Sequence, residues 1–130
     1  MYNSLGKYSK TLVQALLLLA VIYVGSHIFH RIQRQRYLTM AEKALTALAI
    51  EQEIYFSTNF NYTVELTDLN MTDLGPLLVS LVATSDGWSG VAQHKNLSSE
   101  DGCTIYFGTT DVPSLGTSTP RFPGDVACTP

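Results

Sequence analysis

The sequence predicts an α+β protein, in which a long N-terminal transmembrane and amphipathic helix packs on a small antiparallel β-sheet closed by one C-terminal disulfide. Three observations predict this fold. An apolar run covers residues 12–29, and a helical pattern continues from it without a break. No proline occurs before Pro76, and no glycine occurs between Gly25 and Gly75. Short strand-like segments and two cysteines then follow.

The 130 residues divide into three expected parts. Residues 1–10 form a cytoplasmic leader or tail, residues 11–57 form one continuous helix, and residues 58–130 form a globular head. The net charge of −3 gives no sign of nucleic-acid binding. Six of the eight Lys and Arg residues lie in the first third of the chain, whereas ten of the eleven acids lie from Glu51 onward. We therefore expect the basic third at a lipid surface and the acidic remainder in water.

The apolar run is long enough to cross a membrane. As a helix, residues 12–29 would extend about 27 Å, close to the roughly 30 Å of a hydrocarbon core, with Lys10 and Arg31 snorkelling at its ends. The alternative is a secretory signal peptide, with residues 12–24 as its apolar part and cleavage near Gly25. Cations flank both ends of the run, so charge alone does not set its orientation.

The cysteine pair indicates the compartment. Cys103 and Cys128 are the only cysteines, and an even pair in a small exported domain predicts one disulfide in an oxidising environment. Closing a loop of about 26 residues would stabilise the head by roughly 3 kcal/mol. Two buried free thiols are the alternative. A disulfide would place the head outside the cytoplasm and Met1 inside.

Residues 37–56 predict an amphipathic helix. Its apolar stripe recurs at three-to-four spacing and consists of Leu38, Ala41, Leu45, Leu48, Gln52 and Tyr55. A stripe this wide needs a partner, either the sheet of the head or neighbouring helices. From residue 11 to residue 56 the helix would be about 69 Å long. The polar residues 57–59 favour caps and turns, and are expected to end it.

The rest of the chain predicts an antiparallel meander. Residues 59–75 form a loop with one short helical turn. Strand-like segments then follow at residues 77–83, 88–94 and 103–107, and their short connections favour three or four antiparallel strands. Trp88 and His94 share one side of an alternating strand, so His94 is expected to pack rather than to serve a site. Residues 109–130 have no apolar period, and a bond at Cys128 would tie them down.

The sequence shows no set of residues for catalysis, so we expect no enzyme, no cofactor, no metal and no small-molecule substrate. His27 and His30 lie one helical turn apart, but a metal would need further ligands that the sequence does not supply. There is no Cys-x-x-Cys, phosphate loop or nucleophile elbow. Asn61, Asn70 and Asn96 lie in glycosylation sequons, and the Ser/Thr-rich tail is a candidate acceptor of O-glycans.

Several motifs occur in a recognisable order. AIEQEIYF at residues 49–56 precedes the Asn-Tyr-Thr of residues 61–63. Gly-Trp-Ser at residues 87–89 precedes GCTIYFG at residues 102–108 and the late Cys128. With a membrane helix in front and a C-terminal disulfide loop behind, this layout resembles type IV pilins and type II secretion pseudopilins. The resemblance covers roughly residues 29–128.

The resemblance implies a non-catalytic, single-pass protein of the bacterial inner membrane, with its C-terminus outside the cytoplasm. It would assemble into a pilus-like filament or pseudopilus with itself or with related pilin-like subunits, and would reach the cell surface when assembled. The residues expected to pack in a bundle of helices are Leu12, Leu16, Leu19, Tyr23, Leu38, Ala41, Leu45 and Leu48. The residues expected in the head core are Tyr55, Trp88, Ile105 and Phe107. Gly6 is the processing site that the resemblance implies.

The N-terminus departs from the family pattern. Pilins carry a glutamate near the start of the apolar helix and a proline inside it, and this chain has neither. Thr11 or Gln14 would have to hydrogen-bond between helices in place of the glutamate. These departures favour the alternative function, a monomeric membrane-anchored protein whose outward-facing head binds a partner or ligand.

Overall fold

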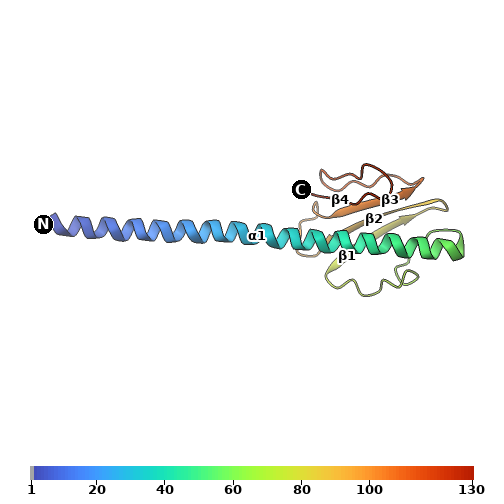
Figure 1. Ribbon diagram of the computed structural model, residues 1–130, viewed down its shortest axis with the longest axis horizontal. Coiled ribbons are helices and arrows are strands. Elements are labelled where there is room, and N and C mark those ends of the chain that lie inside the picture. Colours follow the sequence, from blue (N-terminus) through green and yellow to red (C-terminus); the bar gives the residue numbers. More distant parts are fainter. Residues whose placement is uncertain (1) are drawn as a thin grey trace. The chain divides into compact units, whose positions relative to one another are not determined.

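Helix α1 runs from Tyr2 to Asn59 and includes the whole predicted helix of residues 11–57 (Figure 1). The computed structural model describes the backbone from residue 2 onward and the side chains of residues 9–130. Gly6, the implied processing site, lies outside the range whose side chains are described. The end of α1 at Asn59 falls in the polar cluster expected to stop the helix.

The chain separates into two compact units that share α1. Residues 1–34 form the N-terminal unit and residues 35–130 form the head. The N-terminal unit consists of helix alone, and every side chain from Ser9 to Ile32 is exposed. A lone helix has no interior, so these apolar side chains cannot be buried within their own unit.

The head contains one four-stranded antiparallel sheet in the order β1-β2-β3-β4 (Figure 1). Its strands are β1 Leu77–Ala83, β2 Gly87–His94, β3 Cys103–Gly108 and β4 Ala127–Cys128. The expected α+β fold and antiparallel meander are therefore confirmed, and the first three strands match the predicted segments to within one residue. The two-residue β4 is too short to give a sequence pattern, and it pairs Cys128 directly opposite Cys103.

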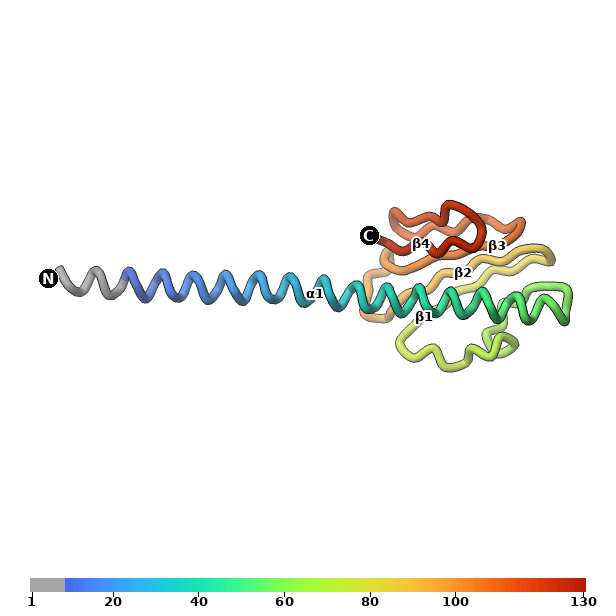
Figure 2. The backbone as a smooth tube through the Cα atoms, viewed as in Figure 1, coloured from blue at the N-terminus to red at the C-terminus, as the bar shows by residue number. Residues whose placement is uncertain are grey.

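The C-terminal part of α1 lies across one face of this sheet (Figure 2). A Cβ placed on Gly90 of β2 would lie 3.2 Å from Leu48 Cδ2 and 3.3 Å from Leu45 Cδ2, so a glycine here lets the helix approach closely. The side chains of α1 that this packing buries are Leu38, Ala41, Leu45, Leu48 and Gln52, all 0–4% exposed.

This packing corrects one expectation. Leu38, Ala41, Leu45 and Leu48 are expected from the sequence to pack in a bundle with neighbouring helices, but the sheet of the same chain covers them. The apolar stripe alone did not distinguish the two partners, because a sheet and a helix bundle both require such a stripe. Of the predicted bundle residues, only those of the N-terminal unit remain exposed.

The predicted head-core residues all lie in or against the core. Trp88 and Ile105 are fully buried, while Tyr55 and Phe107 are partly buried against them. The rings of Trp88 and Phe107 stack with their centroids 5.8 Å apart. The indole N–H of Trp88 has no hydrogen-bond partner among the described residues, so apolar packing rather than a polar contact fixes this ring.

The loop from α1 to β1 is held by a buried glutamine. Gln52 Nε2 donates to the Thr63 carbonyl oxygen at 2.6 Å, and Gln52 Oε1 accepts from the Thr63 backbone N–H at 3.2 Å. Leu69, which the sequence analysis did not identify, is fully buried and anchors the middle of the loop. The short helical turn expected here is a run of hydrogen-bonded turns at residues 66–70 rather than a helix.

The predicted disulfide is confirmed, because Cys103 and Cys128 are bonded with their Cα atoms 4.0 Å apart. Around it, the Thr129 backbone N–H donates to the Gly102 carbonyl oxygen at 3.0 Å. The Gly102 N–H donates to Thr129 Oγ1 at 3.2 Å. The covalent bond is thus embedded in a hydrogen-bonded pairing of two neighbouring strands.

The segment that the disulfide closes is held in a way the sequence did not predict. Val112 and Phe122, two of its few apolar side chains, remain exposed. Backbone hydrogen bonds hold the segment instead: the Gly124 N–H donates to the Tyr106 carbonyl oxygen at 2.8 Å, and residues 115 and 118 form a small bridge. Ser, Thr and Gly supply no apolar pattern, so these backbone hydrogen bonds could not be predicted from the hydropathy of the sequence.

Candidate functional site

Two surfaces are candidates for function, and the first is the apolar surface of the N-terminal unit. Between residues 12 and 29 the large apolar side chains are 53–69% exposed. The described chain contains one helix long and apolar enough to cross a membrane, near the N-terminus, with a mean hydropathy of 2.1 in its most apolar window. The predicted bundle residues Leu12, Leu16, Leu19 and Tyr23 all lie on this exposed surface.

Two polar side chains of this apolar helix make contacts one turn earlier on the same helix. The Ser26 hydroxyl donates to the Tyr23 carbonyl oxygen at 2.8 Å, one turn earlier. The His27 ring meets the Tyr23 ring edge-on, with centroids 5.0 Å apart. Among the described residues no group of three or more His, Cys, Asp or Glu side chains is placed to hold a metal ion. His27 and His30 are therefore not joined there by further ligands.

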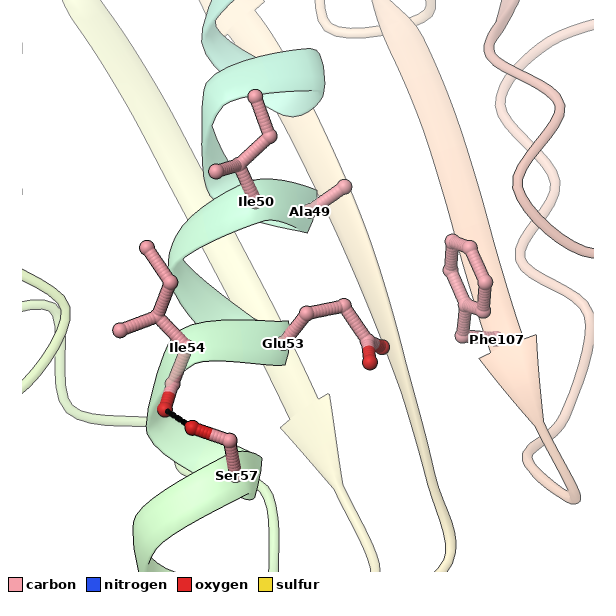
Figure 3. Close-up of a pocket in the computed structure, with 6 residues that line it drawn as sticks. All are labelled: Ala49, Ile50, Glu53, Ile54, Ser57 and Phe107. Atoms are coloured by element: carbon pink, nitrogen blue, oxygen red, sulfur yellow. Dashed lines mark hydrogen bonds between the residues drawn. The ribbon is translucent and has the colours of Figure 1, made fainter.

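The second surface is a groove on the head, which we call the helix groove. It is open, has a volume of about 490 Å³, and is lined by Ala49, Ile50, Glu53, Ile54, Ser57 and Phe107. Figure 3 shows the Glu53 carboxylate reaching across from α1 toward Phe107, while Ile50 and Ile54 stand on the other side of the helix. The Ser57 hydroxyl is turned back onto the Ile54 carbonyl oxygen at 2.7 Å (Figure 3). The groove is thus mainly apolar, with one carboxylate.

A protruding aromatic side chain lies just beyond the groove. Phe60 is 79% exposed, and its backbone φ of 57° lies in the left-handed region. Glycine is the usual residue where a helix ends in this conformation, because a side chain is strained there. The Phe60 N–H donates to the Phe56 carbonyl oxygen at 2.8 Å and completes the end of the helix.

The segment around Phe60 is fixed to the helix by aromatic and polar contacts. The Tyr62 ring stacks on Phe56 with centroids 4.7 Å apart, and its hydroxyl donates to Glu53 Oε1 at 3.3 Å. Burial raises the pKa of Tyr62, and the charge of Glu53 and its hydrogen bond raise it further. Glu53 therefore connects the helix groove to the segment that carries Phe60.

The histidine of the sheet is a packing residue, as expected. His94 is buried against Tyr37, the two rings stacking with centroids 3.9 Å apart at an interplanar angle of 14°. His94 Nδ1 accepts the Asn96 backbone N–H at 3.1 Å. Burial lowers the pKa of His94, and the nearby positive charge of Lys95 lowers it further. His94 is thus a buried packing residue whose Nδ1 accepts a hydrogen bond from the backbone.

Charge divides between the two units. The N-terminal unit has four Lys and Arg residues and no acid, a net charge of +4. The head has four Lys and Arg residues against eleven Asp and Glu residues, a net charge of −7. The sequon residues Asn61, Asn70 and Asn96 are all exposed on the head. Nearby heads would repel one another electrostatically unless salt screens them.

No family model and no curated protein matches this chain. The resemblance to pilins and pseudopilins therefore stays a prediction that rests on the order of the motifs. What the structure itself defines is a set of three parts. Those parts are one apolar helix, an α+β head with its own closed core, and one disulfide. The sequence analysis missed the helix groove and Phe60, because a single aromatic after a helix-ending polar cluster has no recognisable pattern.

Proposed function

We propose that this protein is a non-catalytic structural subunit, anchored in a membrane by its N-terminal helix, that assembles side by side with further copies into a pilus-like filament. One observation carries the proposal. The apolar side chains of the N-terminal unit are exposed all round the helix, whereas the head buries its own stripe from Leu38 to Gln52. Lipid covers such a helix before assembly, and the same helix of neighbouring copies covers it in a filament core.

The burial pattern supports a different role for each of the two parts of α1. Leu12, Leu16, Leu19 and Tyr23 are free to pack against neighbouring helices, while the later stripe is already occupied by the sheet. The basic N-terminal unit suits the anionic inner surface of a membrane, and the acidic head suits water outside it. The disulfide suits an oxidising compartment on that outer side.

Electron microscopy of material sheared from expressing cells tests the proposal. Filaments whose subunit mass matches this chain are expected, and they should disappear when Leu16 and Leu19 are both replaced by serine. In a matched control, Leu78 and Val82, which are exposed apolar residues of the head sheet, are both replaced by serine, and filaments should remain. Monodisperse monomers under all conditions, with no filaments from cells, would contradict the assembly.

The alternative is a monomeric anchored protein whose head binds a partner. The absence of any acid from the first 34 residues favours it, because pilins use a glutamate there to pair neighbouring subunits. Mass spectrometry of the mature N-terminus separates the two functions. A start at Lys7 with an N-methylated amine supports the filament, whereas an intact Met1 without filaments supports the monomeric anchor.

A further inference from the structure

We infer that a stripe of histidine and arginine side chains, at the end of the apolar run nearer the head, binds the headgroup of an anionic phospholipid. The stripe consists of His27, His30, Arg31 and Arg34, all within the N-terminal unit. The inference rests on the membrane anchor of the proposed function and is independent of assembly into a filament. The lipid would belong to the leaflet on the side of the head.

The four side chains of this stripe share one face of α1. Because successive residues of an α-helix are about 100° apart, positions 27, 30, 31 and 34 fall within an arc of about 100°. The first three of these side chains are exposed, and Arg34 is half-buried. The opposite side of the same turns carries large apolar side chains that are 49–58% exposed, namely Ile28, Phe29 and Ile32. The end of the apolar run is therefore two-sided, with one side suited to acyl chains and the other to headgroups.

The depth of the stripe matches the headgroup region of a bilayer. From Lys10 to Arg31 the helix extends about 31 Å, and a hydrocarbon core is roughly 30 Å thick. With Lys10 at one surface, Arg31 therefore reaches the other surface, and His27 lies about 6 Å before it. The Tyr23 ring, which meets the His27 ring edge-on at a centroid distance of 5.0 Å, extends the polar face by one more turn. Tyrosine is enriched at this depth because its ring is apolar and its hydroxyl is polar.

Phosphate is the acceptor that these side chains suit. A guanidinium presents paired N–H donors whose geometry matches two phosphate oxygens, and even a neutral imidazole presents one N–H. No Asp or Glu occurs before Glu42, so this part of the helix supplies no counter-ion of its own. Polar and charged side chains next to hydrocarbon are costly unless a partner satisfies them. A lipid phosphate is the acceptor that a bilayer provides at this depth.

The positive charge of the stripe favours an anionic headgroup over a zwitterionic one. Phosphatidylethanolamine carries an ammonium group beside its phosphate, and this cation would be repelled by the guanidinium of Arg31. Phosphatidylglycerol carries the phosphate without the cation. Each arginine near an anionic surface increases the affinity about fivefold. Salt screens this attraction, so the preference for the anionic lipid should decrease as the salt concentration rises.

Lipid titration of the full-length protein in uncharged detergent micelles tests the site. Phosphatidylglycerol and phosphatidylethanolamine with the same acyl chains are added separately, and native mass spectrometry counts the bound lipids. The wild type should bind phosphatidylglycerol more tightly, and a higher ammonium acetate concentration should reduce the difference. Arg31→Gln should weaken phosphatidylglycerol binding about fivefold and leave phosphatidylethanolamine binding nearly unchanged. The matched control is Arg121→Gln, which removes the same charge from an exposed position of the head and should bind as the wild type does.

A second variant tests the histidines of the stripe. Replacing both His27 and His30 by phenylalanine keeps two aromatic rings but removes the imidazole N–H donors. Phosphatidylglycerol binding should weaken by about a few-fold, because the phosphate loses hydrogen bonds. Both variants change exposed side chains of the N-terminal unit, so the unfolding of the head should stay as in the wild type.

Equal binding of the two lipids, equal losses in Arg31→Gln and Arg121→Gln, or full affinity in the histidine variant would overturn the inference. Displacement of the lipid by excess inorganic phosphate would also overturn it, because the stripe would then bind phosphate as such rather than a headgroup. Alkaline extraction of membranes separates this inference from the proposed anchor. Protein that resists extraction but does not prefer phosphatidylglycerol rejects the headgroup site and leaves the anchor intact, whereas protein that is extracted rejects both.

Discussion

The two parts of α1 look alike in sequence but differ in what covers them. In the N-terminal unit the apolar side chains point in all directions, and all are exposed. In the head they form one stripe, and the sheet buries it. The difference shows that hydropathy identifies a helix that needs a partner, and that the spacing of its apolar residues indicates whether one face or the whole circumference needs to be covered.

Energetics separates the two parts in the same way. The core beneath the second part of α1 contains Leu45, Leu48, Trp88 and Ile105, and their burial stabilises the head on its own. The first part contributes nothing to that core, since its side chains meet only solvent in the isolated chain. Its apolar surface can contribute only in a membrane or an assembly. Identical substitutions in the two parts should therefore differ in their effect on the stability of the head.

The largest expected contrast comes from leucine-to-alanine replacement. Leu45→Ala should lower the free energy of unfolding of the head by about 2–5 kcal/mol, because it leaves a cavity in a fully buried site. Leu16→Ala should leave that free energy unchanged, because Leu16 lies on exposed helix. Denaturant titration followed by fluorescence of Trp88, the only tryptophan, measures both. Equal destabilisation by the two variants would contradict the division of α1.

A charge in the apolar run should act on the membrane alone. Leu19→Arg places a cation near the middle of the expected span, at a cost of about 2.5–3.5 kcal/mol for insertion. The fraction of protein that resists alkaline extraction from membranes should fall, while the melting of the head stays as in the wild type. Leu78→Arg is the control, because Leu78 is 62% exposed and Leu19 is 63% exposed. Equal extraction of both variants would argue against a membrane span.

Loss of the disulfide should act on the head alone. Replacing both Cys103 and Cys128 by alanine should cost roughly 3 kcal/mol, since it frees a loop of about 26 residues in the unfolded chain. Limited proteolysis should cut first within residues 109–130 and last within residues 38–55. Backbone hydrogen bonds also hold the C-terminal segment, so partial protection is expected to remain. Cleavage that begins in α1 would show that the bond stabilises the helix instead.

Most of the fold could be predicted from the sequence because the spacing of apolar residues indicates most of its elements. The stripe that begins at Leu38 identified most of the α1 side chains that the head buries. Cys103 and Cys128 gave the only long-range contact that residue type alone can indicate. What covered the stripe was not predictable, because a sheet and a helix bundle both bury the same residues.

The candidate site was harder to predict because its features are geometric. Phe60 is exceptional only through its φ of 57° and its exposure. The helix groove joins Phe107 of β3 to side chains of α1 that lie some fifty residues earlier. The local pattern of apolar and polar residues carries no information on such distant pairs. For the same reason it predicted neither the hydrogen bonds between Gln52 and Thr63 nor the burial of Leu69.

Replacing Phe60 by glycine should stabilise the isolated head. Phe60→Gly relieves the left-handed backbone and removes an exposed ring, so the free energy of unfolding should rise by about 0.5–1 kcal/mol. Thermal unfolding of the wild type and the variant measures the difference. The control is Phe122→Gly, which removes another exposed ring. A destabilised Phe60→Gly head would mean that the ring contributes to folding.

The smallest expected effect is a pH dependence of head stability that comes from His94. Burial and the charge of Lys95 lower its pKa in the folded head below the ordinary value of 6.5. Below about that pH the unfolded chain therefore binds a proton that the folded head does not, and stability falls as the pH decreases. Above it, both states are neutral and the contribution is fully present.

Between pH 7.5 and 5.5 the wild type should lose stability, while His94→Asn should lose less, because asparagine cannot be protonated but still offers an acceptor to the Asn96 N–H. Denaturant midpoints across this range give the comparison. Equal slopes for both proteins would mean that the stack on Tyr37 accommodates the imidazolium, and that burial does not exclude the charge.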